Sequence, residues 1–186
     1  MEITILRHGK PDPISDHLMT ASEFIHWIAL YDQSKVSINT LPLPSSVTYA
    51  NNCDVIICSG LQRSIDSATI LNGKKIVLCD ALFKEAGLPS AGGKIIKMSP
   101  KAWSVLFRVL WFFGYSTNSE SFEAAKKRAS LATDKLVELA GKHGHVLFVG
   151  HGIFNRLLIK ALIKRGWSST SAHQSKYWAG SQYKKN

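Results

Sequence analysis

Three short apolar runs divide this chain, and each is followed closely by glycine and polar residues. The runs span residues 2–6, 54–59 and 145–149. Continuous apolar runs of this length are typical of strands buried on both faces, as in a parallel sheet. Between them lie longer segments in which apolar positions recur every three or four residues, the spacing of amphipathic helices. This alternation predicts an α/β fold with a mostly parallel central sheet.

The helices expected from this spacing and from their end signals cover residues 20–31, 64–71, 100–113, 122–140 and 153–164. Thr20 and Glu23 have the spacing of a capping box. Ser99 and Pro100 are a typical helix start, with serine as the N-cap and proline in the first helical position. The helix that begins at residue 122 should cover one face of the sheet, and we expect Gly141 to end it.

The remaining segments are less periodic. A further strand is expected at residues 75–79. Residues 175–186 are expected to form an edge strand with a basic tail. Residues 32–52 are rich in proline, serine and asparagine and are expected to form a connecting loop that contains a short turn of structure at most. The aromatic helix at 103–113 is apolar nearly all round, which favours core packing and leaves a pocket wall or an interface open.

Polar side chains that could bind a ligand or take part in a reaction follow the ends of the predicted strands. Arg7 and His8 leave the first run, Arg63 follows the second, and His151 follows the third. Glu85 comes after the strand at 75–79. Because the carboxyl ends of parallel strands meet at one edge of a sheet, we expect these side chains to share one crevice.

Composition places the chain among ordinary globular proteins. It has 186 residues, 45% hydrophobic and 19% charged, which predicts a single domain over residues 1–186. The formal net charge of +10 suits anionic partners but does not choose among them. We find no signal-peptide pattern and expect no membrane span. Cys53, Cys58 and Cys79 lack CxxC spacing and predict reduced core thiols in a cytoplasmic protein.

Two arginines and two histidines around one point suit a tetrahedral dianion. Arginine makes bidentate contacts with phosphate, so Arg7 and Arg63 are the predicted phosphate clamps. A neutral imidazole can attack phosphorus. We favour His8 over His151 for that role, because Gly9 lets the chain turn sharply beside it. His151 would then donate hydrogen bonds to the phosphoryl oxygens.

Two further groups complete the predicted site. Gly152 begins a helix whose first backbone N–H groups should add to anion binding. Glu85 is the carboxylate we nominate to protonate the leaving group, with an exposed surface carboxylate as the alternative. These cationic and donor groups could neutralise a phosphoryl group by themselves, so neither a metal ion nor a cofactor is expected.

The segments Leu6-Arg-His-Gly9, Cys58-Ser-Gly-Leu-Gln-Arg-Ser64 and Val149-Gly-His-Gly152 resemble, in order, the three signature segments of the histidine phosphatase superfamily, in its phosphoglycerate mutase-like branch. The resemblance runs from the second residue to about residue 163. It implies a three-layer α/β/α sandwich and a phosphohistidine on His8. It also implies phosphate contacts from Arg7, Arg63 and His151, with Glu85 as the acid.

Departures from the family pattern reduce the number of candidate functions. Mutase-like members resemble one another in a Glu or Gln and a Thr after the first motif, where this chain has Lys10-Pro11-Asp12. The leading hypothesis is therefore a phosphoric monoester hydrolase acting on a small phosphorylated metabolite or a phosphoprotein. The alternatives are a phosphoglycerate-type mutase and a non-catalytic basic module that binds polyanions; nucleic acid is not the expected partner. Lys10, Lys84, Lys94 and Lys97 suggest a second anionic group on the substrate.

Overall fold

A six-stranded sheet forms the centre of the computed structural model, which describes residues 1–170 and 174–185. Its strand order is β4-β3-β6-β1-β8-β7. The strands are β1 (Glu2–Arg7), β3 (Val55–Ser59), β4 (Ile76–Asp80), β6 (His145–Gly150), β7 (Ser168–Ser169) and β8 (Gly180–Lys184). The neighbours from β4 to β1 pair in parallel, and β8 and β7 pair antiparallel. The sheet is thus mostly parallel, as the apolar runs predicted.

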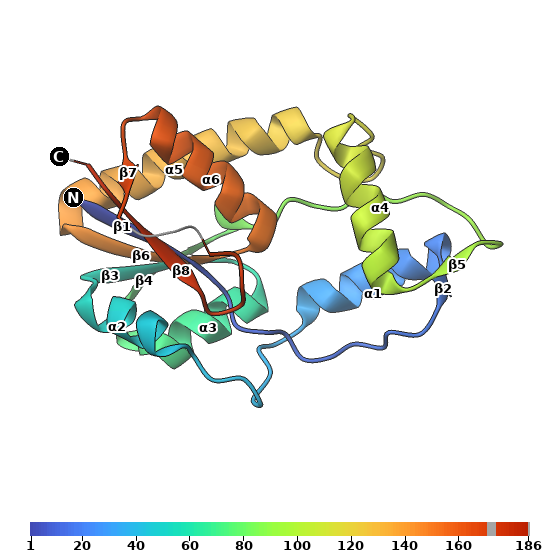
Figure 1. Cartoon of the computed structure of the whole chain (residues 1–186), viewed down its shortest axis with the longest axis horizontal. Coiled ribbons are helices and arrows are strands. Elements are labelled where there is room, and N and C mark those ends of the chain that lie inside the picture. Colours follow the sequence, from blue (N-terminus) through green and yellow to red (C-terminus); the bar gives the residue numbers. More distant parts are fainter. Residues whose placement is uncertain (171–173, 186) are drawn as a thin grey trace.

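Helices cover both faces of this sheet (Figure 1). On one face lie α5 (Phe122–His143) and α6 (Gly152–Lys164), and on the other lie α2 (Pro44–Asn52) and α3 (Gln62–Asn72). Alternate residues of each strand enter opposite cores. Ile5 and Phe148 pack in the cluster that includes α5 and α6, while Leu6 and Leu147 pack in the cluster that includes α2 and α3. The result is the expected three-layer α/β/α sandwich.

A smaller lobe stands beyond the carboxyl ends of the parallel strands, on the right in Figure 1. It consists of α1 (Ala21–Gln33), α4 (Pro100–Phe112) and a two-stranded sheet of β2 (Met19–Thr20) and β5 (Lys97–Met98). The helices are joined by stacked aromatic rings, with the Phe24 and Phe107 centroids 5.8 Å apart. Trp103 is buried against both rings and donates its indole N–H to the Met19 carbonyl at 2.8 Å. The lobe therefore has an aromatic core of its own.

The predicted helix starts are present. Thr20 accepts the backbone N–H of Glu23 at 3.3 Å, and Glu23 accepts the N–H of Thr20 at 2.7 Å, which completes the capping box. Ser99 caps α4, with Pro100 in its first position. None of the helices in the described part of the chain is long and apolar enough to cross a membrane.

Three expectations about elements were wrong. The predicted loop contains α2, which buries only Ser46 and Ala50 and so has no sustained apolar period. Helix α5 continues past Gly141 to His143 and is capped by Gly144, whose φ of 96° is a left-handed conformation that glycine adopts readily. The C-terminal strand β8 is not an edge strand, because β7 pairs with its outer side.

The prediction that the cysteines are core residues was correct for two of the three. Cys53 and Cys58 are buried, whereas Cys79 is exposed. Cys79 lies on β4, which stands at one end of the strand order of the described sheet.

Candidate active site

The two signature histidines meet because β1 and β6 are parallel neighbours in register. Arg7 is opposite Gly150 in this pairing, so the next residue of each strand leaves the sheet at the same place. The backbone N–H of His8 donates to the Gly150 carbonyl at 2.9 Å. The imidazole centroids of His8 and His151 lie 5.0 Å apart, and the two residues are only 2% and 0% exposed.

One hydrogen bond fixes the tautomer of His8. Its Nδ1 lies 2.7 Å from the carbonyl oxygen of Gly9. A carbonyl oxygen can only accept, so Nδ1 carries the proton and Nε2 presents a lone pair. Burial, followed by the positive charge of Arg63, lowers the pKa of His8 to about 3, although the bond to Gly9 opposes this shift. The imidazole is therefore neutral at physiological pH.

The position of Gly9 has no room for a side chain. A Cβ atom placed on it would stand 2.4 Å from the ring of Trp178 and 2.8 Å from a methyl group of Val36. Its N–H donates to the hydroxyl of Ser67 on α3 at 2.8 Å, so the residue beside His8 is held on both sides. The sharp turn expected after His8 is thus a close approach of backbone to an indole ring.

His151 is the N-cap residue of α6 and is tied to two neighbouring elements. Its Nε2 is hydrogen-bonded to the hydroxyl of Ser59, which accepts the N–H of Leu61 at 3.2 Å. Its backbone N–H donates at 3.0 Å to Asn155, whose amide donates to the Leu6 carbonyl at 3.1 Å. Burial, then the nearby charges of the site, lower the pKa of His151 well below its usual value. The buried Nδ1 has no hydrogen-bond partner in the described residues.

Arg7 lies at the rim of the same site. Its Nη1 donates to the Ser175 carbonyl at 2.7 Å, and its guanidinium carbon is 4.0 Å from the centroid of the Tyr177 ring. A Cβ on Gly152 would come within 3.5 Å of that carbon, so the start of α6 packs closely against the guanidinium. The buried Nε of Arg7 has no hydrogen-bond partner among the described residues.

Arg63 is held more firmly than the sequence suggested. Its Nη1 donates to the carbonyls of Tyr31 and Asp32 at 2.9 and 3.3 Å, and its Nη2 forms an ion pair with the Asp32 carboxylate at 3.2 Å. It therefore joins α3 to the last turn of α1, whose terminal carbonyls need donors. Its side chain is 1% exposed, and its Nε has no partner in the described part of the chain.

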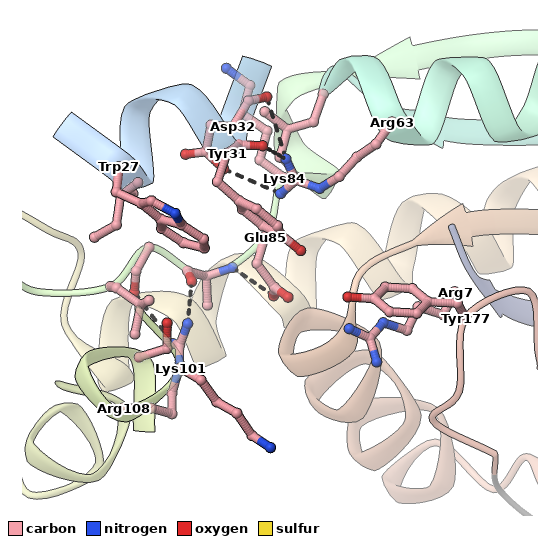
Figure 2. A pocket seen from close by; sticks show the side chains of 16 residues that line it. Arg7, Trp27, Tyr31, Asp32, Arg63, Lys84, Glu85, Lys101, Arg108 and Tyr177 are labelled. Carbon is pink, nitrogen blue, oxygen red and sulfur yellow. Dashed lines mark hydrogen bonds and ion pairs between the residues drawn. The ribbon is translucent and has the colours of Figure 1, made fainter. Parts of the chain in front are cut away.

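Glu85 follows the short 3₁₀ helix η2 (Ala81–Phe83) after β4. Its carboxylate oxygens accept the backbone N–H groups of Ile153 and Phe154 at 3.1 and 2.8 Å. Two of the α6 N–H groups near the helix start, those of Ile153 and Phe154, are therefore already occupied by Glu85. Glu85 nevertheless lines the cavity, and Figure 2 shows it near the centre of that lining.

A cavity of about 680 Å³ lies between the sheet and the lobe (Figure 2). The buried His8 and His151 are not among the described residues that line it. Arg7, Arg63 and Glu85 line the part nearest the sheet, and α1 contributes Trp27 and Tyr31. From α4 come three polar side chains, Lys101, Ser104 and Arg108. The aromatic helix therefore serves both as core and as a pocket wall.

Of the lysines suggested to meet a second anionic group, only Lys84 is in this lining; Lys10, Lys94 and Lys97 lie outside it. Lys101 and Arg108 were not singled out from the sequence. Arg108 donates to the Ala86 carbonyl at 2.8 Å, so its position depends on the segment that follows Glu85.

A parallel α/β sandwich with two histidines at the ends of adjacent strands defines a class of proteins. The family model of the histidine phosphatase superfamily (branch 1) matches residues 46–179, and the chain belongs to this superfamily. The matched range begins after the Arg7-His8-Gly9 motif, which the fold nevertheless places beside His151. A comparison with curated protein sequences finds no match.

Solved structures with the same fold include phosphatases. The chain is 20% identical to a mycobacterial glucosyl-3-phosphoglycerate phosphatase, covering 88% of this chain and 79% of that one with a TM-score of 0.57. It is 16% identical to a phosphoserine phosphatase mutant from Entamoeba histolytica in complex with phosphoserine, covering 88% and 80% with a TM-score of 0.57. At these identities the likeness concerns the fold.

Several residues of the site carried no sequence signal. Ser59 lies inside the second motif but stood out only as part of it. Tyr177 and Asp32, which hold the two arginines, are distant in sequence from their partners. Asn155 lies one helical turn after His151, and no pattern distinguished it from other polar residues of α6.

Proposed function

We propose that this chain is a phosphomonoesterase that works through a phosphohistidine on Nε2 of His8. The observation that carries the proposal is the bond from Nδ1 of His8 to the Gly9 carbonyl, which leaves Nε2 as the free lone pair. The lowered pKa of His8, about 3, keeps that lone pair unprotonated over the whole physiological range. A neutral, oriented imidazole is the form required of a nucleophile.

In the first step the lone pair of Nε2 forms a bond to phosphorus, and the bond from phosphorus to the ester oxygen breaks. The leaving oxygen takes the electron pair and a proton. In the second step water attacks phosphorus and gives a proton back to the group that protonated the leaving oxygen. The nitrogen–phosphorus bond breaks, its electron pair returns to Nε2 of His8, and inorganic phosphate departs. Both steps concentrate negative charge on the phosphoryl oxygens, so their rates depend on donors already in place.

Three buried donor atoms support a phosphoryl site at this position. Nε of Arg7, Nε of Arg63 and Nδ1 of His151 have no partner among the described residues. Buried polar atoms normally have partners, so unpaired groups around one nucleophile favour a bound anion as the missing acceptor. If Ser59 donates its hydroxyl proton to Nε2 of His151, Nδ1 carries the ring proton and can donate it to a phosphoryl oxygen.

Trapping the covalent intermediate tests the nucleophile. The protein is mixed with an aryl phosphate, quenched in alkali, and assayed for an acid-labile phosphoryl group. The parent protein and His26→Ala, which removes an exposed imidazole of α1, should both form it, and His8→Ala should not. Equal turnover by His8→Ala would refute the assignment.

We assign the proton for the leaving group to Glu85, because its carboxylate lines the cavity beside the arginines. The test compares two leaving groups. Glu85→Gln keeps one oxygen for the α6 N–H groups but cannot donate a carboxyl proton. It should slow hydrolysis of an alkyl phosphate by about 10²–10⁴-fold and of a nitrophenyl phosphate far less, because nitrophenolate leaves without protonation.

The control for this test is Glu138→Gln, which removes an exposed carboxylate of α5 and should leave both rates unchanged. If Glu85→Gln slowed both substrates equally, the role of Glu85 would be structural, as the support of α6.

The substrate that fits best is a small phosphomonoester. A cavity of about 680 Å³ has the size of small-molecule sites, and its walls combine aromatic rings with Lys84 and Lys101. Because the charge is supplied by arginine, activity should persist in the presence of a chelator. Loss of activity in EDTA that returned with a divalent cation would contradict this part of the proposal.

A further inference from the structure

Helix α4 is apolar around most of its circumference and presents three distinct faces. One face is buried and carries Trp103, Phe107 and Trp111. A narrow polar stripe of Lys101, Ser104 and Arg108 lines the candidate active-site cavity. The third face is exposed, although a helix at a protein surface ordinarily turns polar residues outward. It carries Val105, Leu106, Val109, Leu110 and Phe112.

This exposed face continues into neighbouring segments. Phe113, directly after α4, is 86% exposed, and Ile95, before β5, is 94% exposed. Ile95 and Ile96 line a hollow of about 470 Å³ together with residues of α4. We call residues 94–97 and the exposed face of α4 through Phe113 the outer α4 surface. Contiguous exposed apolar area on this scale marks an interaction site.

The stretch of chain that forms the outer α4 surface carries positive charge only, and the exposed Glu23 of α1 lies within electrostatic range of Lys97. Residues 86–119 contain no aspartate or glutamate. Lys94, Lys97 and Lys101 lie in this stretch and are exposed. Apolar side chains bordered by lysines, with no carboxylate in the same stretch of chain, complement a surface that is negatively charged outside and apolar beneath.

We propose that the outer α4 surface docks onto bilayers that contain anionic phospholipid. The exposed valines, leucines and phenylalanines enter the boundary between headgroups and acyl chains, and the lysines meet headgroup phosphates. This is the binding mode of interfacial amphipathic helices, in which apolar area and electrostatic attraction act together. It concerns attachment to one leaflet and is independent of the proposed catalysis.

Two other occupants fit these observations less well. A second copy in a two-fold dimer would place this patch, bordered by Lys94, Lys97 and Lys101, against the same patch of its partner, so that positive charge would border the contact on both sides. A nucleic acid would account for the lysines, but its phosphate backbone makes no use of Val109 or Phe113.

Vesicle co-sedimentation tests the proposal with the full chain. Vesicles of phosphatidylcholine alone are compared with vesicles containing one third phosphatidylglycerol. The parent protein should sediment with the anionic vesicles and not with the neutral ones. The double substitution Val105→Asp with Val109→Asp should abolish sedimentation. Its matched control is Ile38→Asp with Leu41→Asp, at positions that are 90% and 83% exposed outside this surface, which should bind like the parent.

A second pair of variants separates local charge from total charge. Lys94→Glu with Lys97→Glu should weaken vesicle binding by about 25-fold or more, because each surface lysine contributes about fivefold. Lys74→Glu with Lys142→Glu makes the same change in net charge at exposed positions elsewhere and should have a smaller effect. Circular dichroism and thermal unfolding confirm that each variant is folded.

Several outcomes would overturn the proposal. One is equal binding of the parent to neutral and anionic vesicles, or no binding to either. Another is a parent dimer, seen by light scattering, that Val105→Asp with Val109→Asp dissociates. Because the readout is sedimentation, loss of phosphatase activity in His8→Ala leaves this test unaffected.

Discussion

At the scale of single residues, the site keeps a histidine neutral by surrounding it with positive charge and excluding water. Arg63 and Arg7 both lower the pKa of His8, and burial is the larger cause. The same arginines and His8 itself act on His151. Both imidazoles are therefore kept from taking a proton that they would bind in the unfolded chain, and this arrangement costs stability in acid.

The first prediction concerns that cost. Between the unfolded pKa near 6.5 and the folded pKa of about 3, the unfolded chain binds more protons at His8 than the folded one. The free energy of unfolding must then fall as pH decreases through this window, by up to about 1.4 kcal/mol per pH unit for each such histidine. Urea unfolding of the parent and of His8→Asn from pH 6.5 to 4 should show a smaller slope for the variant. Parallel curves would contradict it.

The second prediction concerns Gly9. Gly9→Ala should destabilise the protein by about 1–3 kcal/mol, because its methyl group would overlap the Trp178 ring. It should also reduce phosphoryl transfer, since the Gly9 carbonyl orients His8. The control is Gly92→Ala, where an added Cβ has nothing within 4 Å and φ is not positive. Urea unfolding measures the free energy of unfolding of both variants. Equal values for Gly9→Ala and the parent would show that the Trp178 ring can move aside, which would contradict the prediction.

At the scale of elements, the strands and helix starts that depend on local sequence patterns could be predicted. The apolar runs placed β1, β3 and β6 with their motifs, and the capping box placed the start of α1. Helix α2 was not predicted, because a helix that buries only Ser46 and Ala50 has no apolar stripe. The attachment of Arg63 to the end of α1 was not predicted from the sequence for another reason. It depends on how α1 and α3 pack, which spacing along the chain does not encode.

The third prediction concerns the link between α6 and the sheet. Asn155→Ala would leave the Leu6 carbonyl and the His151 N–H without their present partners in a buried place. We expect a loss of about 2–4 kcal/mol of stability. Because Asn155 positions His151 and touches no reacting atom, kcat should fall with little change in KM at temperatures where the variant is folded. Asn51→Ala on the exposed side of α2 is the control, and a change in KM alone would contradict the positioning role.

At the scale of the whole molecule, the sandwich carries the paired histidines and the lobe forms the outer wall of the cavity. The convergence of His8 and His151 could be predicted, because parallel strands bring their carboxyl ends together. The lobe could not, because β2 and β5 have two residues each and the polar stripe of α4 is too narrow among its apolar residues for its orientation to be inferred. Lys101 and Arg108 consequently emerged as cavity residues only from the packing of α4 against α1.

The last prediction uses the charge of the whole molecule. With a net charge of +10, the protein should attract a dianionic aryl phosphate from a distance, and salt should screen that attraction. We expect kcat/KM to fall several-fold as ionic strength rises from about 0.02 to 0.5 M, with kcat nearly constant. Lys84→Gln, which removes a charge from the cavity wall, should reduce this salt dependence more than Lys74→Gln, which lies outside it. Equal effects of the two would mean that total charge, and not the cavity, steers the substrate.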